Sequence, residues 1–194
     1  WRNLANELGF EFTEEQNERF KGVSRVRSLE ILLEIGGVQA TQEQKDGWLI
    51  SKNEEYLSYI SKMTADDILP GVLKVLNYLR DKNIPMALGS ASKNAQPILK
   101  RVGLFERFDC IVDGNHVTKA KPDPEVFTIG ADELGVAYED AIVFEDSIAG
   151  IQAANRVNMV SVGIGDAQVL NEADHNFNDF TEIDTSFLDQ LINA

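Results

Sequence analysis

The feature that most constrains the fold of this chain is an alternation of short apolar runs with helical patterns, which begins after Pro70. Four apolar runs predict strands at 84–88, 110–112, 141–144 and 159–163. Helical periodicity predicts helices at 72–79, 95–102, 122–134 and 148–157. Strands that alternate with helices of this length are typical of βαβ units, so we expect a parallel, Rossmann-like sheet. A last strand near 177–180 and a closing helix over 185–192 complete this α/β unit.

The residues before Pro70 follow a different pattern. From Trp1 to about Asp67 the apolar residues recur at spacings of three and four, and no segment is typical of a strand. Thr13, which has Gln16 three residues after it, and Ser24 predict helix starts. We therefore expect about four helices here, and two domains in all: a helical cap over 1–68 and an α/β core over 69–194.

The charge balance limits the classes of partner. The chain has 18 Lys and Arg against 32 Asp and Glu, a formal net charge of −14. Nucleic acids and anionic membranes need a basic surface, so we expect neither as a partner. A small phosphorylated substrate stays compatible, because a local cluster of Lys and Arg can hold it. The single cysteine cannot form an internal disulfide. No signal-peptide pattern or bilayer-spanning run is visible, which favours a cytoplasmic location.

Polar residues follow the first expected strand. In open parallel sheets, ligands bind at the carboxyl ends of the strands. The residues there are Gly89-Ser90-Ala91-Ser92-Lys93-Asn94, and they lead into a helix. Small hydroxyl side chains and free backbone N–H groups at such a point can hold an anion. An ordinary helix N-cap is the alternative, and the residues alone do not decide between the two.

Charged residues follow two further strands. Lys121 comes just before a proline at a helix start, where its ammonium could neutralise phosphate oxygens; a solvated surface lysine is the alternative. Glu145 and Asp146 end a buried apolar strand, and adjacent carboxylates predict a nearby cation such as Mg²⁺. The alternative is that Asp146 caps the next helix and Glu145 points outward. A hydroxyl, a lysine and a carboxylate pair predict a phosphoryl-transfer site, although no residue of this chain is a convincing nucleophile.

The order Ser90, Lys121-Pro122, Glu145-Asp146, preceded by a helical segment, resembles the haloacid dehalogenase superfamily, and within it the β-phosphoglucomutase branch. Further similar strings are Lys21-Gly22-Val23-Ser24-Arg25 with Ser28-Leu29, Lys52-Asn53, Ser90-Ala91-Ser92-Lys93-Asn94, and the run from Glu145 to Ala153. The similarity runs along nearly the whole chain. The lysine–proline and acidic motifs are shared across the superfamily, whereas the Gly-Val-Ser-Arg and Ser-Ala-Ser-Lys-Asn strings are closer to the mutase branch.

The resemblance implies an Mg²⁺-dependent enzyme that interconverts β-glucose 1-phosphate and glucose 6-phosphate through an aspartyl-phosphate and a bisphosphate. It implies catalytic roles for Ser90 and Lys121 and metal binding by Glu145 and Asp146. The residues that it implies for substrate binding are Trp1, Gly22, Val23, Arg25, Lys52, Ala91, Ser92, Lys93 and Asn94. Its partner would be a small phosphorylated sugar, and a cap over a compact core favours a monomer.

The sequence departs from the superfamily pattern in one respect. The Asp-x-Asp motif, which in the superfamily follows a first core strand and supplies the nucleophile and the general acid/base, is not present in these residues. We expect this strand and motif upstream of Trp1, and we expect residues 1–194 alone to be inactive. Two other functions stay open: a sugar-phosphate phosphatase that uses water as acceptor, and a non-catalytic remnant that binds a phosphosugar or a partner.

Overall fold

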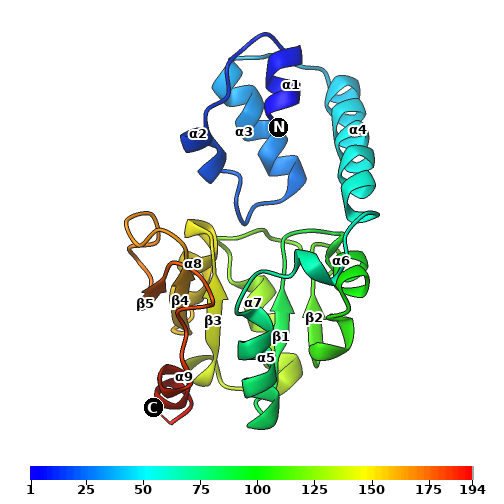
Figure 1. Cartoon of the computed structure of the whole chain (residues 1–194). Coiled ribbons are helices and arrows are strands. Elements are labelled where there is room, and N and C mark those ends of the chain that lie inside the picture. The colour runs from blue at the N-terminus through cyan, green and yellow to red at the C-terminus, as the bar shows by residue number, and fades with distance from the viewer. Residues whose placement is uncertain (194) are drawn as a thin grey trace.

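A computed structural model describes residues 1–193 and separates a helical unit from an α/β unit (Figure 1). We call the helical unit, α1 to α4, the cap, and the α/β unit, from α5 onward, the core. The elements of the cap are α1 (Arg2–Glu7), α2 (Glu14–Glu18), α3 (Arg25–Gly36) and α4 (Gln42–Ile60). The expectation of about four helices before Pro70 is therefore confirmed. No helix within residues 1–193 is long and apolar enough to cross a membrane.

Side-chain caps set the starts of the cap helices. The backbone N–H of Gln16 donates to Thr13 Oγ1 at 3.2 Å, and the backbone N–H of Thr13 donates to Gln16 Oε1 at 2.9 Å. Ser24 Oγ accepts from the backbone N–H of Arg27 at 3.2 Å, so both expected helix starts are confirmed. Each cap occupies a backbone donor that the helix itself leaves unpaired.

The cap has its own apolar interior. Its helices enclose Leu4, Ala5, Phe12, Phe20, Leu29, Ile31, Leu32 and Leu33. The rings of Phe12 and Phe20 meet edge to face with centroids 5.0 Å apart. This interior is what fixes α3, and with it the polar residues at the start of α3, relative to the rest of the cap.

The core alternates strands and helices as the sequence predicts. Its longer elements are α5 (Val72–Asp81), β1 (Ala87–Gly89), α6 (Ala95–Val102), β2 (Cys110–Val112), α7 (Glu125–Leu134), β3 (Ile142–Glu145), α8 (Ile148–Asn155), β4 (Val160–Ile164), β5 (His175–Phe177) and α9 (Thr185–Ile192). Short 3₁₀ turns lie at η1 (Ala65–Asp67), η2 (Phe105–Arg107) and η3 (Tyr138–Asp140). All strand pairs are parallel, which confirms the predicted fold class.

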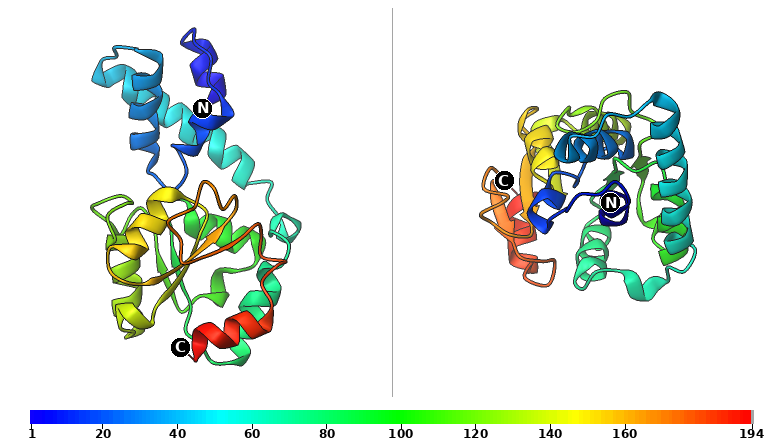
Figure 2. Two further views of the ribbon diagram at one scale, coloured as in Figure 1. Left: turned by 90° about the vertical axis from the view of Figure 1, so that its left-hand side faces the viewer. Right: turned by 90° about the horizontal axis from the view of Figure 1, so that it is seen from above.

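The strands form two ladders. β1 pairs with β2, with Leu88 opposite Ile111, and β3, β4 and β5 pair in that order. Within the described residues β1 and β3 are not paired with each other. Helix α7 packs on β1 and β2, and α8 packs on β3 and β4. Figures 1 and 2 show the cap standing over one end of these strands.

Residues 61–71 connect the cap to the core, and we call them the connecting segment. Thr64 starts its 3₁₀ turn, with its backbone N–H donating to Asp67 Oδ2 at 2.8 Å. Gly71 has φ = +85°, and a Cβ atom there would overlap the backbone of Phe180. Only glycine combines this backbone angle with such a close approach, so the end of the segment is seated tightly on the core.

Three sequence predictions match the structure to the residue: the helix at 95–102, the strand at 110–112 and the helix at 185–192. The last strand exists but lies earlier than the predicted 177–180, because β5 covers His175–Phe177. The Asp179 carboxylate accepts the backbone N–H of Thr181 at 2.7 Å and turns the chain there. The helix predicted from residue 122 starts at Glu125, whose N–H is held by Asp123 Oδ1 at 3.1 Å in the preceding turn. The first strand is shorter than predicted and begins at Ala87.

Candidate active site

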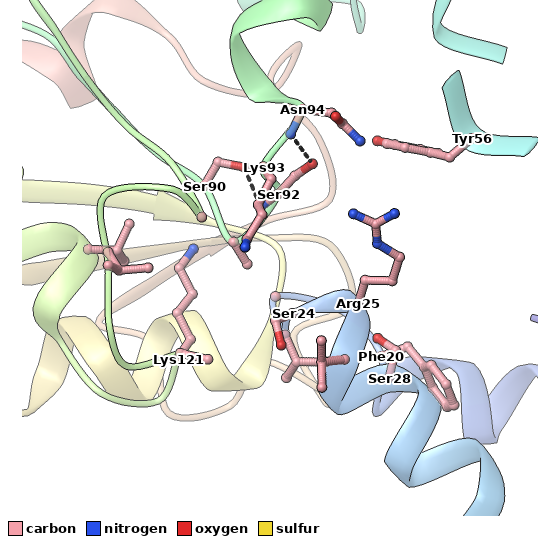
Figure 3. Close-up of a pocket in the computed structure, with 18 of the residues that line it drawn as sticks. Phe20, Ser24, Arg25, Ser28, Tyr56, Ser90, Ser92, Lys93, Asn94 and Lys121 are labelled. Atoms are coloured by element: carbon pink, nitrogen blue, oxygen red, sulfur yellow. Dashed lines mark hydrogen bonds between the residues drawn. The ribbon is translucent and has the colours of Figure 1, made fainter. Parts of the chain in front are cut away.

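A cavity of about 1450 Å³ lies between the cap and the core, and both units supply its walls. All thirteen residues named as site candidates line it: Trp1, Gly22, Val23, Arg25, Lys52, Ser90, Ala91, Ser92, Lys93, Asn94, Lys121, Glu145 and Asp146. Figure 3 shows the serines and lysines of the core side facing Arg25 and Tyr56 of the cap side. The structure thus brings the candidates together, while their individual roles stay predictions.

Lys121 and Glu145 form a buried ion pair at the core wall of the cavity. Their side chains are 5% and 7% exposed, and the ammonium contacts Glu145 Oε1. Lys121 Nζ also lies 3.4 Å from the carbonyl oxygen of Gly89 and 4.6 Å from the ring centroid of Phe127. The alternative of a solvated surface lysine is therefore wrong. The buried pair holds a positive charge next to the end of β1.

The second oxygen of Glu145 is held by the turn that follows β3. Glu145 Oε2 accepts from the backbone N–H of Asp146 at 2.8 Å, and from the backbone N–H and the hydroxyl of Ser147, each at 2.9 Å. Ser147 Oγ in turn accepts from the N–H of Gly150 at 3.0 Å and caps α8. The alternative in which Asp146 is the cap and Glu145 points outward is wrong.

Asp146 is the carboxylate that this arrangement leaves open. Its residue is exposed and lines the cavity, whereas Glu145 is turned into the protein. Partial desolvation in the cavity and then the negative charge of Glu145 raise the pKa of Asp146, and Lys21 acts in the opposite direction. An open carboxylate beside a second carboxylate fits a hard cation such as Mg²⁺. Within residues 1–193 no cluster of three His, Cys, Asp or Glu side chains is placed to hold a metal.

The segment after β1, residues 90–94, forms two consecutive hydroxyl-stabilised turns. Ser90 Oγ accepts the backbone N–H of Ser92 at 3.2 Å, and Ser92 Oγ accepts the backbone N–H of Asn94 at 3.1 Å. The backbone N–H of Ser90 donates to the carbonyl oxygen of Val112 at 2.9 Å, which ties the segment to β2. The start of α6 at Ala95 has no side-chain cap bond, so the simple N-cap alternative does not account for these serines.

The cap wall brings two cations to the cavity. Arg25 Nη1 lies 3.4 Å from the carbonyl oxygen of Leu49, and no described carboxylate lies within ion-pair distance of its guanidinium. Lys52 Nζ contacts Glu55 Oε2 at 2.5 Å and lies 5.6 Å from the Trp1 ring centroid. Arg25 therefore carries a charge that an anionic ligand can pair with at low desolvation cost.

Contacts between the cap and the core, at Gly22 and at Asn94, lie beside the cavity. Gly22, with φ = +71°, lies so close to the core that a Cβ atom there would overlap the Ser147 side chain. Asn94 Nδ2 donates to Asn53 Oδ1 on α4 at 3.1 Å. These contacts place the cap residues directly over the ends of β1 and β3.

Two residues of the site were not predicted. Ser147 supports Glu145, and a signal for it exists, because a serine directly before an apolar helical run is a typical N-cap. Tyr56 lines the cavity one helical turn after Lys52, so the spacing of four residues would have placed both on one face of α4. Figure 3 shows the Tyr56 hydroxyl pointing toward Asn94.

Comparisons with known proteins agree on one family. A family model described as haloacid dehalogenase-like hydrolase matches residues 2–158. The β-phosphoglucomutase of Bacillus subtilis is 39% identical over 176 residues, which cover 90% of this chain and 78% of the relative. A phosphorylated carbohydrates phosphatase of Thermotoga maritima is 30% identical over 180 residues, which cover 89% of this chain and 81% of the relative.

A solved structure extends this similarity to three dimensions. The crystal structure of β-phosphoglucomutase from Clostridium difficile superposes with a TM-score of 0.92 at 36% sequence identity. The superposition covers 100% of this chain and 87% of that protein. Cap, core and their connection therefore follow the same overall path in both molecules.

Proposed function

The chain belongs to the haloacid dehalogenase-like hydrolase family, and from that premise we propose that it is the phosphosugar-binding part of a β-phosphoglucomutase. The proposed reaction interconverts β-glucose 1-phosphate and glucose 6-phosphate through a bisphosphate. The observation that carries the proposal is the pair of opposed walls in one cavity: Lys121 with Glu145 and Asp146 on the core, and Arg25 on the cap. A mutase must bind a phosphate at each end of its substrate, and a cationic side chain on each of two opposed walls, Lys121 and Arg25, fits that need.

In this proposal the residues act by positioning and by charge neutralisation, which dominate phosphoryl transfer. The Lys121 ammonium, fixed by Glu145, faces the transferring phosphoryl group, and Ser90 and the N–H of Ala91 orient it. Arg25 binds the other phosphate, because a guanidinium can donate two parallel hydrogen bonds to it. Gly22 and Val23 offer backbone N–H groups, and Trp1, Lys52, Ser92, Lys93 and Asn94 surround the sugar.

Mg²⁺ fits this site as the cation that Asp146 and Glu145 would hold. Asp146 is the better placed of the two, since both Glu145 oxygens already have protein partners. When bound, the ion would offset negative charge on the phosphoryl oxygens. We propose that the nucleophilic aspartate comes from a further segment that adds a strand between β1 and β3, where the two ladders are separate.

A sugar-phosphate phosphatase on the same scaffold is the second candidate, and the phosphatase relative from Thermotoga maritima favours it. The two functions differ in the acceptor, which is a sugar hydroxyl in the mutase and water in the phosphatase. The cap–core contacts at Gly22 and Asn53 favour the mutase, because they hold the cap over the core end of the cavity, and a cap there can limit the access of water to the phosphoryl group.

The test is an assay of the protein expressed from its complete gene, beside residues 1–194 alone. With β-glucose 1-phosphate, Mg²⁺ and a glucose bisphosphate primer, we expect glucose 6-phosphate to form faster than inorganic phosphate is released. Predominant phosphate release identifies a phosphatase, and neither product identifies a binding remnant. Turnover by residues 1–194 alone contradicts the proposed origin of the nucleophile.

A cap variant tests the second phosphate site. Arg25→Ala should raise the KM for the sugar phosphate by about tenfold or more, because it removes a charge-assisted hydrogen-bond pair. Arg19→Ala is the matched control, since Arg19 lies on the same cap, is half exposed and does not line the cavity. If both substitutions changed the KM by the same factor, Arg25 would not be a phosphate-binding residue.

A further inference from the structure

A buried acidic residue, Asp113, lies directly after β2 and is linked through Asn115 to the segment that lines the cavity. Asp113 is 1% exposed and does not line the cavity. In the described residues its carboxylate has no Lys or Arg partner. The half-exposed His116 lies beside it, with Nδ1 3.0 Å from Oδ1, and this Nδ1 accepts the backbone N–H of Asp113 at 3.1 Å. Burying a carboxylate costs folding free energy unless the carboxylate is paired and hydrogen-bonded. The groups that donate hydrogen bonds to Asp113 are therefore held firmly in place.

The partner of Asp113 is Asn115, and the pair reaches the substrate segment. Asp113 Oδ1 accepts from the backbone N–H of Asn115 at 2.9 Å and from its side-chain Nδ2 at 3.0 Å. Asn115 Nδ2 also donates to the carbonyl oxygen of Lys93 at 3.1 Å. Both hydrogens of this amide are thus used. The opposite amide orientation would set an oxygen against two acceptors, so the network determines which way Asn115 points.

The backbone between these two residues makes a second contact with the same segment. The N–H of Gly114 donates to the carbonyl oxygen of Ser92 at 3.3 Å. A Cβ atom on Gly114 would lie 2.6 Å from the carbonyl oxygen of Ala91 and 3.1 Å from the backbone nitrogen of Lys93. Residues 113–115 therefore lie in direct contact with the backbone of residues 91–93, and two consecutive carbonyl oxygens of that segment are held from outside it.

Other attachments hold the two ends of residues 90–94, at the Ser90 N–H and at the Asn94 side chain, whereas the middle depends on bonds within the segment. These internal bonds are the two hydroxyl turns of Ser90 and Ser92, whose oxygens are also the groups proposed to meet the ligand. Those two turns would be disturbed whenever a phosphate competed for the hydroxyls. An external attachment at the carbonyl oxygens of Ser92 and Lys93 holds the segment without using the hydroxyls or the N–H of Ala91, which are proposed to meet the ligand.

We propose that Asp113 and Asn115 are positioning residues, which we call the Asp113–Asn115 brace, and that the brace fixes the ligand-facing geometry of residues 91–94. The inference rests on the proposed function for the identity of the ligand, a phosphorylated sugar. The contacts themselves do not depend on it. Asp113 and Asn115 would thus affect ligand affinity although neither residue lines the cavity.

The experiment uses Asn115, because this residue is exposed and its substitution should leave the fold intact. The readouts are the Kd of glucose 6-phosphate from calorimetric titration and the hydrogen-exchange rates of the Ser92, Lys93 and Asn94 amides. Asn115→Ala should weaken binding by about fivefold, the equivalent of one hydrogen bond, and speed exchange at the three amides. Asn115→Asp should be at least as harmful, since its carboxylate would face Asp113 and the carbonyl oxygen of Lys93.

Asn178→Ala is the matched control, because Asn178 also donates an exposed side-chain hydrogen bond, to Glu182 Oε1 at 2.7 Å, but away from the cavity. It should leave both readouts unchanged. If Asn115→Asp bound glucose 6-phosphate with wild-type affinity, the hydrogen bonds donated by the Asn115 amide would not matter for binding, and the brace would be overturned. If the unaltered chain does not bind glucose 6-phosphate, the ligand class is wrong, and unchanged exchange at residues 92–94 in Asn115→Ala would then overturn the brace separately.

Discussion

The buried pair of Lys121 and Glu145 gives the sharpest quantitative prediction. Lys121→Met keeps the length and the apolar stem of the side chain but removes the charge, and Glu145 then stays buried without a cation. Removing one partner of a buried ion pair typically costs about 3–5 kcal/mol of unfolding free energy. We expect a loss of about 3 kcal/mol, at the lower end of that range, because Glu145 keeps three hydrogen bonds from Asp146 and Ser147.

The assay is urea unfolding at pH 7 of the single variants Lys121→Met and Glu145→Gln and of the double variant. The double variant should lose less than the sum of the singles, because the second substitution removes the uncompensated charge that the first one leaves. The same cycle on Lys82 and Asp189 is the control. That pair is 3.2 Å apart with side chains 47% and 45% exposed, so its coupling should stay below about 1 kcal/mol.

The reasoning would be refuted if the coupling of Lys121 with Glu145 were no larger than that of Lys82 with Asp189. In that case water or a rearranged turn would screen the pair, and the burial seen here would not govern its energetics. A large stability loss with unchanged catalysis would instead separate the structural role of the pair from the proposed catalytic role of Lys121.

Two further predictions concern the cap contact and the open carboxylate. Gly22→Ala should lower the free energy of unfolding by about 1–2 kcal/mol, because alanine is strained at this positive φ. Its Cβ should also hold the cap away from Ser147, which small-angle scattering would detect as a larger radius of gyration. Gly103→Ala, with φ = +77° and no neighbouring atoms, should show the backbone cost alone. Asp146→Asn should stabilise the fold at pH 7, because the raised pKa of Asp146 means that its ionised form disfavours folding. This gain should disappear as the pH falls through the pKa of Asp146 toward 3.8, and a constant gain in pH-dependent unfolding would contradict it.

The sequence was most informative where apolar runs and turn residues agree. The strand at 110–112 and the helix at 95–102 could be predicted because periodicity and flanking residues indicate the same limits. Phe177 and Phe180 misled the prediction, because two apolar residues three apart also fit a turn whose polar residues bond to the backbone. At Asp179 the side chain bonds the backbone N–H of Thr181 and forms an Asx turn, so the chain turns there instead of continuing the strand.

The composition of the site could be predicted further than its geometry. Because ligands bind at the carboxyl ends of parallel strands, the sequence alone predicts that Ser90, Lys121 and Glu145 lie in one site. The partner of Lys121 could not be predicted, since Glu145 lies 24 residues away and only the fold brings the two together. The contacts between cap and core were equally hidden, because periodicity describes each unit by itself and says nothing of how two units are placed.

The connecting segment has a consequence for how specificity can change. Arg25 on one wall of the cavity belongs to the cap, Lys121 on the other belongs to the core, and residues 61–71 join the two units. The turn at Thr64 and the seat of Gly71 on Phe180 determine the angle at which they meet. The spacing between Arg25 and Lys121, the two groups proposed to bind phosphate, therefore also depends on Thr64 and Gly71, which do not line the cavity. Substitutions at these two positions would select longer or shorter phosphorylated molecules while every cavity-lining side chain stays the same.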